Sequence, residues 1–285
     1  MMRLSGTGLW KRLSETERLN RVTWEYSHPR WPSSADGFCA LFISDIHYGE
    51  LLSKAQWDRL IRELTLPGCD VILFGGDFGD TAGDSLECIE KLSPVLEGKR
   101  VIAVPGNHDL RGGGELERLS AAAEKAGWEM PVNRCVPLTG GAAAAGLDDF
   151  QEGNPDVEKV RRESAGSPFT LLMAHNPDVL AGIEDAFYQL ALCGHTHGGQ
   201  VTLGGRGLIS SSRYRERYRS GWKRENGADI LIGNGIGVSL LPVRLGAVPQ
   251  AIRIVFRHGE HAARLLSDET VTDGRKKGVR GRKTE

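Results

Sequence analysis

The chain has 285 residues, of which 40% are hydrophobic, so it is long enough for one large domain or two small ones. Its 36 Lys and Arg side chains balance 37 Asp and Glu side chains, and the formal net charge at pH 7 is -1. Without a global basic excess the protein would release few counterions from a phosphate backbone, so we do not expect nucleic acid as a partner.

The five cysteines are an odd number and form no Cys-x-x-Cys pair, which favours free thiols in a reduced compartment. Cys39, Cys69 and Cys193 adjoin or fall within apolar runs and are expected to act as small buried hydrophobes. The first 20 residues lack the apolar core and cleavage site of a signal peptide, and no apolar run approaches the roughly 20 residues that span a bilayer. We therefore predict a cytoplasmic location.

Alternating strand and helix signals follow a polar lead-in at residues 1–20. A strand is expected at 21–26, and a Pro-rich loop follows it. Ser53 is a suitable N-cap for the first helix, and Pro94 is expected to divide or kink the second. Apolar runs and segments with i, i+3, i+4 spacing then predict strands and helices in alternation. Their ranges, beginning with a strand, are 38–44, 53–68, 70–76, 84–98, 100–106 and 115–127.

Strands dominate the second half of the chain. Several are separated by too few residues for helical crossovers, so part of the sheet should be antiparallel or mixed. We predict an α/β fold with a second sheet packed on the first, in one domain at 21–258. The remaining residues, 259–285, are basic and largely without apolar patterning, and we expect a disordered tail. The expected strands are 135–138, 142–147, 168–175, 190–195, 199–203, 228–233 and 250–256.

Side chains of the types that bind metals follow the carboxyl ends of five apolar strands, and five of the eight histidines stand there. Sites in open α/β sheets lie at this end of the strands. The glycines that accompany these side chains allow the backbone to turn sharply and to approach a ligand. The side chains are those of Asp45, His47, Asp77, Asp80, Asn107, His108, His175, His195 and His197.

A donor set of Asp, Asn and His suits Mn, Fe or Zn better than Ca or a thiolate-bound Zn, with Ni or Mg as alternatives. Without Asp80 and His108, seven of these side chains remain, and seven metal ligands are more than one ion needs. They suit two ions that share a bridging carboxylate, which Asp77 could supply.

In their order the motifs resemble those of the calcineurin-like metallophosphoesterases, and in particular a bacterial branch of phosphohydrolases. That family has D-x-H, G-D, G-N-H-[DE], a lone His and G-H-x-H. The resemblance covers about Arg21 to Phe256 and implies a two-sheet sandwich with helices on both outer faces. The motifs here are DIH at 45–47, GD at 76–77, GNHD at 106–109, His175 and GHTH at 194–197.

The resemblance also implies which residues bind each ion. Asp77 would bridge the two ions. The implied ligands are Asp45, His47 and His197 for one ion, and Asn107, His175 and His195 for the other.

Two cations so placed would neutralise a phosphoester and acidify a bridging water, whose hydroxide attacks phosphorus. His108 is expected to donate a proton to the leaving oxygen or to stabilise transition-state charge. Asp80 is expected to hold His108 protonated, as the matching aspartate does in some relatives, with a capping or turn role as the alternative. The expected activity is hydrolysis of phosphomonoesters or phosphodiesters on a small phosphorylated substrate.

Asn107, Arg111 and Arg244 are candidates to contact the substrate, although each arginine could instead be an ordinary surface or salt-bridging residue. Thr81 stands where protein serine/threonine phosphatases have an arginine, and Asp109 stands where they have Glu, so we do not expect a protein phosphatase. The segment 204–226, rich in arginine and aromatic residues, is either a rim around the site or a solvated loop.

Three alternatives stay open. The first is a nuclease or cyclic-nucleotide phosphodiesterase that uses the same metals. The second is a catalytically silent scaffold, against which the complete set of ligands argues. The third is a peripheral membrane enzyme acting on a phosphorylated lipid, which the basic segments permit and nothing in the sequence requires.

Overall fold

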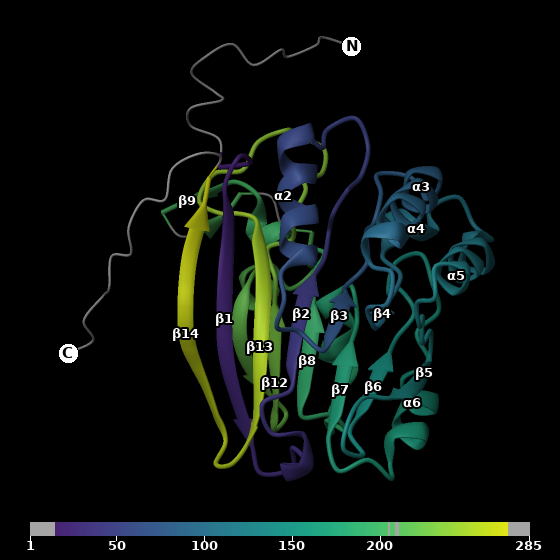
Figure 1. The fold of residues 1–285 in the computed structure, drawn as a ribbon, viewed down its shortest axis with the longest axis vertical. Coiled ribbons are helices and arrows are strands. Elements are labelled where there is room, and N and C mark those ends of the chain that lie inside the picture. Colours follow the sequence, from purple (N-terminus) through teal and green to yellow (C-terminus); the bar gives the residue numbers. More distant parts are fainter. Residues whose placement is uncertain (1–14, 205, 209–210, 273–285) are drawn as a thin grey trace.

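The computed structural model describes residues 15–204, 206–208 and 211–272. Two six-stranded mixed sheets pack face to face, and helices cover both outer faces (Figure 1). The predicted fold class is therefore confirmed. Among the described residues, no helix is long and apolar enough to cross a membrane.

The first sheet has the order β14-β1-β13-β2-β3-β4, in which β2, β3 and β4 are parallel neighbours. Every residue of these three strands is buried, because one face packs on helices and the other on the second sheet. The strands are β1 (Leu19–His28), β2 (Cys39–Ile43), β3 (Val71–Phe74), β4 (Val101–Ala103), β13 (Gln250–His258) and β14 (Ala262–Val271).

The second sheet has the order β11-β12-β8-β7-β6-β5. Its four central strands run parallel, and β5 and β11 pair antiparallel at the edges. A separate two-stranded ribbon joins β9 (Thr202–Leu203) to β10 (Arg206–Gly207). The strands of the large sheet are β5 (Arg134–Pro137), β6 (Ala143–Gly146), β7 (Thr170–Met173), β8 (Leu190–Cys193), β11 (Gly221–Glu225) and β12 (Ala228–Ile232).

Three helices, α2, α3 and α5, pack on the first sheet, and α6 packs on the second. Ser53 caps α2 in a reciprocal capping box with Gln56, as its sequence position predicts. Pro94 divides the second helix, because α3 ends at Leu92 and a 3-10 turn follows at Ser93–Val95. The α-helices are α2 (Lys54–Thr65), α3 (Ala82–Leu92), α4 (Asn107–Leu110), α5 (Glu115–Lys125) and α6 (Val157–Ser164).

The prediction of a disordered tail at 259–285 is wrong for ten of its residues, because 262–271 form β14, which pairs antiparallel with β1. Most side chains of β14 are exposed, so the strand is held by main-chain hydrogen bonds and has no apolar pattern to reveal it. The rest of the predicted basic tail, 273–285, and most of the predicted lead-in, 1–14, lie outside the described residues.

Candidate metal centre

The loops that follow β2, β3, β4, β7 and β8 meet at one end of the sandwich and bring all seven predicted ligands together. Three groups of side chains have potential ligand atoms within 4.8 Å of one another, among the residues that the structure describes. They are Asp45 with His47 and His197, His47 with Asp77 and His108, and Asp77 with His175 and His195.

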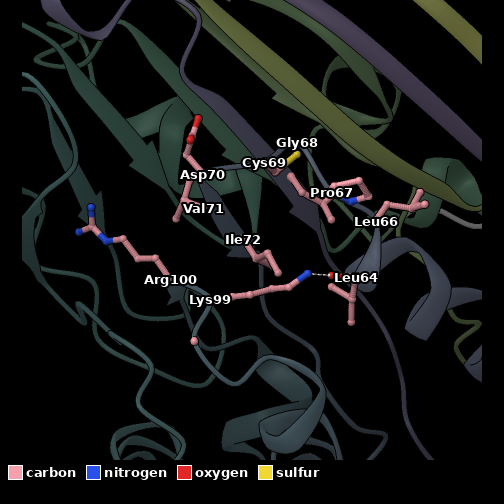
Figure 2. A pocket seen from close by; sticks show the side chains of 12 residues that line it. Leu64, Leu66, Pro67, Gly68, Cys69, Asp70, Val71, Ile72, Lys99 and Arg100 are labelled. Carbon is pink, nitrogen blue, oxygen red and sulfur yellow. Dashed lines mark hydrogen bonds between the residues drawn. The ribbon is translucent and has the colours of Figure 1, made fainter.

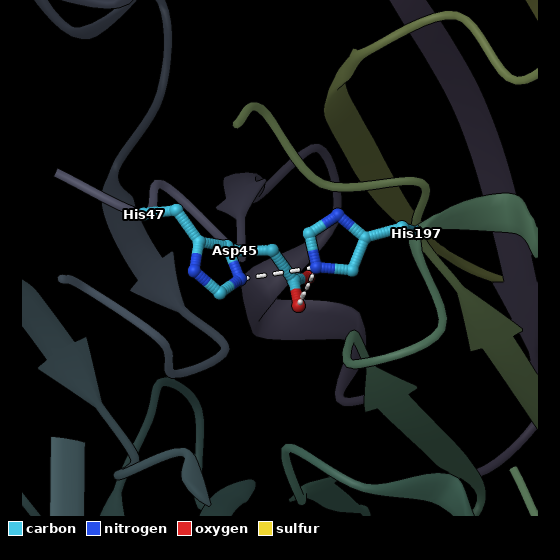
Figure 3. A group of neighbouring side chains, drawn as sticks. All are labelled: Asp45, His47 and His197. Carbon is cyan, nitrogen blue, oxygen red and sulfur yellow. Dashed lines mark hydrogen bonds and ion pairs between the residues drawn. The ribbon is translucent and has the colours of Figure 1, made fainter. Parts of the chain in front are cut away.

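Asp45, His47 and His197 form the first ligand group (Figure 3). The Nε2 atoms of His47 and His197 face each other at 3.0 Å, and His197 Nε2 lies 3.5 Å from Asp45 Oδ1. All three side chains are buried. Asp45 comes from the loop after β2 and His197 from the loop after β8, so both sheets contribute to this group.

Asn107, His175 and His195 form the second ligand group. His195 Nδ1 lies 3.0 Å from Asn107 Oδ1 and 3.2 Å from His175 Nε2. Asp77 lies between the two groups, because its Oδ2 atom is 3.4 Å from His47 Nε2 and 3.2 Å from His175 Nε2. Burial opposes the ionisation of Asp77, but His175 and His47 lower its pKa well below the usual value and so keep it charged.

The donor distances fit metal coordination. Bonds of about 2.1 Å at angles between octahedral and tetrahedral values would separate neighbouring donors by roughly 3.0–3.4 Å. The facing ring nitrogens of His47 and His197 can share one proton at most, and an ion between them would use both lone pairs. The residues present therefore suit metal ions.

Five of the predicted ligands have a left-handed backbone, although none of them is glycine. Each such residue costs of order 1 kcal/mol or more and persists only where the surrounding structure holds it. The main chain supplies part of that restraint, since Asp45 N donates to Gly76 O and His47 N donates to Asp77 O. The φ angles are 50° at Asp45, 48° at His47, 54° at Asp77, 69° at His195 and 51° at His197.

Asp109 fixes the loop that carries Asp77, a role that the sequence did not predict. Its fully buried carboxylate accepts the backbone N–H groups of Asp77, Phe78 and Gly106, each at 2.8 Å, and the hydroxyl of Ser85 at 2.6 Å. Burial, followed by the charge of Asp77, raises the pKa of Asp109 to about 6. Asp109 thus ties the loop after β3 to the loop after β4.

The expected pairing of the Asp80 carboxylate with His108 is wrong. Asp80 Oδ1 lies 2.9 Å from His47 Nδ1, so the carboxylate orients a predicted ligand instead. His108 Nδ1 donates to the main-chain oxygen of Asp80 at 2.9 Å. Arg111 Nη2 lies 3.4 Å from His108 Nε2, so these two side chains are neighbours at the opening of the site.

Arg244 lies behind His197, and it is neither a surface residue nor open to a substrate. Its side chain is fully buried and donates to the main-chain oxygens of His197, Asn234 and Gly237. Its Nη2 atom also lies 2.9 Å from His197 Nδ1. Burial, and then the charge of Arg244, lower the pKa of His197 well below its usual value, which keeps that ring neutral.

Asp149 is a further buried carboxylate at this end of the fold that the sequence reasoning missed. It follows the strand β6, and its Oδ1 atom accepts the N–H groups of Gln151 and Glu152. Burial acts to lower the pKa of His175, but Asp77, Asp45 and Asp149 raise it well above the usual value. The rule that located the predicted ligands, a polar side chain of a metal-binding type just after an apolar strand, also applies to Asp149.

Several known proteins are similar to this chain. The calcineurin-like phosphoesterase family matches residues 40–199. The uncharacterized metallophosphoesterase YkuE of Bacillus subtilis is 29% identical over 229 residues, which cover 77% of this chain and 79% of that protein. Phosphodiesterase YaeI of Escherichia coli is 30% identical over 223 residues, which cover 76% and 81%. The solved structure of TT1561 of Thermus thermophilus is 12% identical with a TM-score of 0.45 and covers 70% of this chain and 90% of that one.

Proposed function

Because the chain belongs to the calcineurin-like phosphoesterase family, we propose that it is a dinuclear metal-dependent hydrolase of phosphomonoesters or phosphodiesters. The observation that carries the dinuclear assignment is the position of Asp77. Its Oδ2 atom lies within 3.4 Å of a histidine from each ligand group, as a bridging carboxylate should.

The two ligand groups would hold one ion each. Asp77 contributes to both, and the mixed oxygen and nitrogen donors favour Mn, Fe or Zn, with Ni or Mg as alternatives. When bound, such ions would offset the negative charge of the phosphoester and acidify water. The first ion would be held by Asp45, His47 and His197, and the second by Asn107, His175 and His195.

His108 and Arg111 are the proposed catalytic and phosphate-binding side chains at the opening of the site. The main-chain oxygen of Asp80 holds the Nδ1–H of His108, which leaves Nε2 to exchange a proton with the leaving oxygen. The adjacent guanidinium of Arg111 would bind a phosphoryl oxygen. Asn107 would serve as ligand and substrate contact, whereas Arg244 supports His197 from behind.

The test is metal-dependent turnover. The protein would be stripped of metal, reconstituted separately with Mn, Fe, Zn, Ni or Mg, and assayed on para-nitrophenyl phosphate and on its bis ester. We expect two ions per chain, and activity that is absent from Asp77→Asn. A protein that binds no metal and turns over neither ester would contradict the proposal and favour the scaffold alternative.

The ratio of the two ester activities separates the remaining enzyme alternatives. A strong preference for the bis ester, accompanied by cleavage of single-stranded DNA or a cyclic nucleotide, would favour the nuclease or cyclic-nucleotide phosphodiesterase. A preference for the monoester without cleavage of nucleic acid would favour a phosphatase acting on a small substrate.

A group of exposed leucines favours, as a second candidate, the membrane enzyme that acts on a phosphorylated lipid. Leu203 is 71% exposed, Leu208 63% and Leu240 81%, and Leu241 and Leu245 are also exposed. We call these five leucines the leucine rim. The segments that carry them are linked by hydrogen bonds to residues 200–202, which begin three positions after His197. Exposed apolar side chains beside Arg206 and Arg215 suit an anionic lipid surface.

Co-sedimentation with phosphatidylglycerol vesicles tests this second candidate. Leu203→Asp and Leu240→Asp should abolish binding, whereas Leu266→Asp should not, because Leu266 is 47% exposed but lies on β14, which pairs with β1 of the first sheet. Equal binding by all three variants, or none by the wild-type protein, would exclude the leucine rim as a membrane surface.

A further inference from the structure

Cys39 and Cys69 lie side by side at the end of the first sheet opposite the metal centre. Their Sγ atoms are 3.0 Å apart, and both thiols are free. Cys39 begins β2 and Cys69 precedes β3, whose far ends lead to Asp45 and Asp77. Cys39 is buried as predicted, but Cys69 is only half-buried, so it is not simply a small core side chain.

Asp70 holds the two cysteine segments together. Its Oδ2 atom accepts the N–H of Cys39 at 2.7 Å, and its own N–H donates to Cys39 O at 2.8 Å. Gly68 has a φ of +93°, a conformation that glycine adopts without strain, and so the chain turns just before Cys69. The proximity of the two sulfur atoms is therefore fixed by the backbone on both sides.

A cavity of about 220 Å³ adjoins Cys69 of this pair (Figure 2). Cys69 lines it together with Pro67, Lys99 and Arg100, whereas Cys39 does not. Since one water occupies about 30 Å³ of liquid, the cavity admits water and molecules of similar size such as hydrogen peroxide. A small oxidant can thus reach Cys69 first, with Cys39 directly behind it.

The two thiols also differ electrostatically. The hydrogen bond from Cys39 lowers the pKa of Cys69, and the charges of Arg253 and Lys99 act in the same direction against burial. The same hydrogen bond, followed by burial, raises the pKa of Cys39. A thiolate is the nucleophilic form of cysteine, so the accessible Cys69 is also the more reactive of the two.

We propose that Cys39 and Cys69 are an oxidisable dithiol, in which Cys69 reacts with hydrogen peroxide and Cys39 closes an intramolecular disulfide. The Cys69 thiolate attacks one peroxide oxygen, the O–O bond breaks, and the leaving hydroxide takes up a proton to form water. The sulfur of Cys39 then attacks the sulfenic acid at Cys69, the S–O bond breaks, and a second water forms. Two thiols lose two electrons, and one peroxide is reduced to two waters.

The test counts thiols in the full-length protein before and after treatment with hydrogen peroxide. The protein would be denatured, alkylated and analysed by mass spectrometry. Oxidation should lower the number of alkylated cysteines from five to three. Fragmentation should assign the bridge to Cys39 and Cys69, and dithiothreitol should restore all of the thiols. A bridge between other cysteines, or no loss of thiols, would overturn the proposal.

Single substitutions separate the two roles. Cys39→Ser should stop at a sulfenic acid on Cys69 that a dimedone probe captures, whereas Cys69→Ser should form no bridge and should leave Cys39 unlabelled by the probe. Cys135→Ser is the matched control, since Cys135 is also half-buried but lies on β5 of the other sheet, and it should form the bridge as the wild-type protein does. Over-oxidation of Cys69 in the wild-type protein without a bridge would contradict the resolving role of Cys39.

Discussion

The metal centre and the cluster around Asp229 both bring histidine against a buried carboxylate, but they satisfy their polar atoms in different ways. At Asp229 one oxygen accepts from the Tyr26 hydroxyl at 2.8 Å and lies beside His261, and the other oxygen accepts from Arg224 at 3.0 Å. At the candidate metal centre, two pairs of histidine ring nitrogens face each other among the described residues, and each pair can share one proton at most.

The two clusters also differ in their backbone conformation. Tyr26 and Asp229 stand on the regular strands β1 and β12, while five predicted metal ligands adopt the left-handed conformation. Strain of this kind is retained where function requires it. A buried group of His and Asp is therefore weak evidence for a metal, whereas facing ring nitrogens on a strained backbone are strong evidence.

Asp77→Asn should have the largest effect on activity and should distinguish the functions of the two clusters most clearly. Loss of the bridging charge should lower kcat/KM for para-nitrophenyl phosphate by at least about 10³-fold, because both ions depend on it. The measurement is steady-state kinetics with metal content determined on the same sample. Activity within tenfold of the wild-type protein would exclude the bridging role.

Asp109→Asn should act through Asp77 without touching the ions. The amide that replaces the carboxylate is a weaker acceptor for the three backbone N–H groups that Asp109 binds. We therefore expect metal affinity and activity to fall by roughly 10–100-fold. A titration of the metal-stripped variant with Mn would measure the affinity. Added metal should restore part of the activity, which would not happen if the variant were merely unfolded.

Tyr26→Phe should affect stability and leave the chemistry unchanged. It removes the hydroxyl that donates to Asp229, and the free energy of unfolding should fall by about 1–2 kcal/mol. Urea denaturation measures this loss, while kcat/KM and metal content should equal the wild-type values. A large loss of activity in the folded variant would show that the two clusters are coupled.

The smallest effect concerns His28, which lies beside His261 in the same region. Burial, and then the charge of His261, lower the pKa of His28 from 6.5 to about 4. Between these values the unfolded chain binds more protons than the folded one, so His28 reduces stability as pH falls from 6.5 towards 4. His28→Gln should therefore lose less stability than the wild-type protein between pH 7 and 4.5, as measured by urea denaturation.

The sequence predicted that the candidate ligands converge, because each one follows an apolar strand and parallel strands bring their carboxyl ends together. It did not predict that Asp80 pairs with His47, since spacing along the chain does not determine side-chain direction. Arg244 was also placed wrongly, because its burial depends on carbonyl groups that gather only in the folded chain. The strand β14 escaped prediction because its side chains are mostly exposed.

The two sheets share the predicted ligands, so bound metal ions would be part of the folding equilibrium. Asp45 and Asp77 extend from the first sheet, while His175 and His195 extend from the second. An ion held by both sheets would be bound only when the sheets are docked, so mass action would stabilise the sandwich by about 1.4 kcal/mol for each tenfold excess of free ion over its Kd. The melting temperature of this protein should consequently record the metal supply of its surroundings.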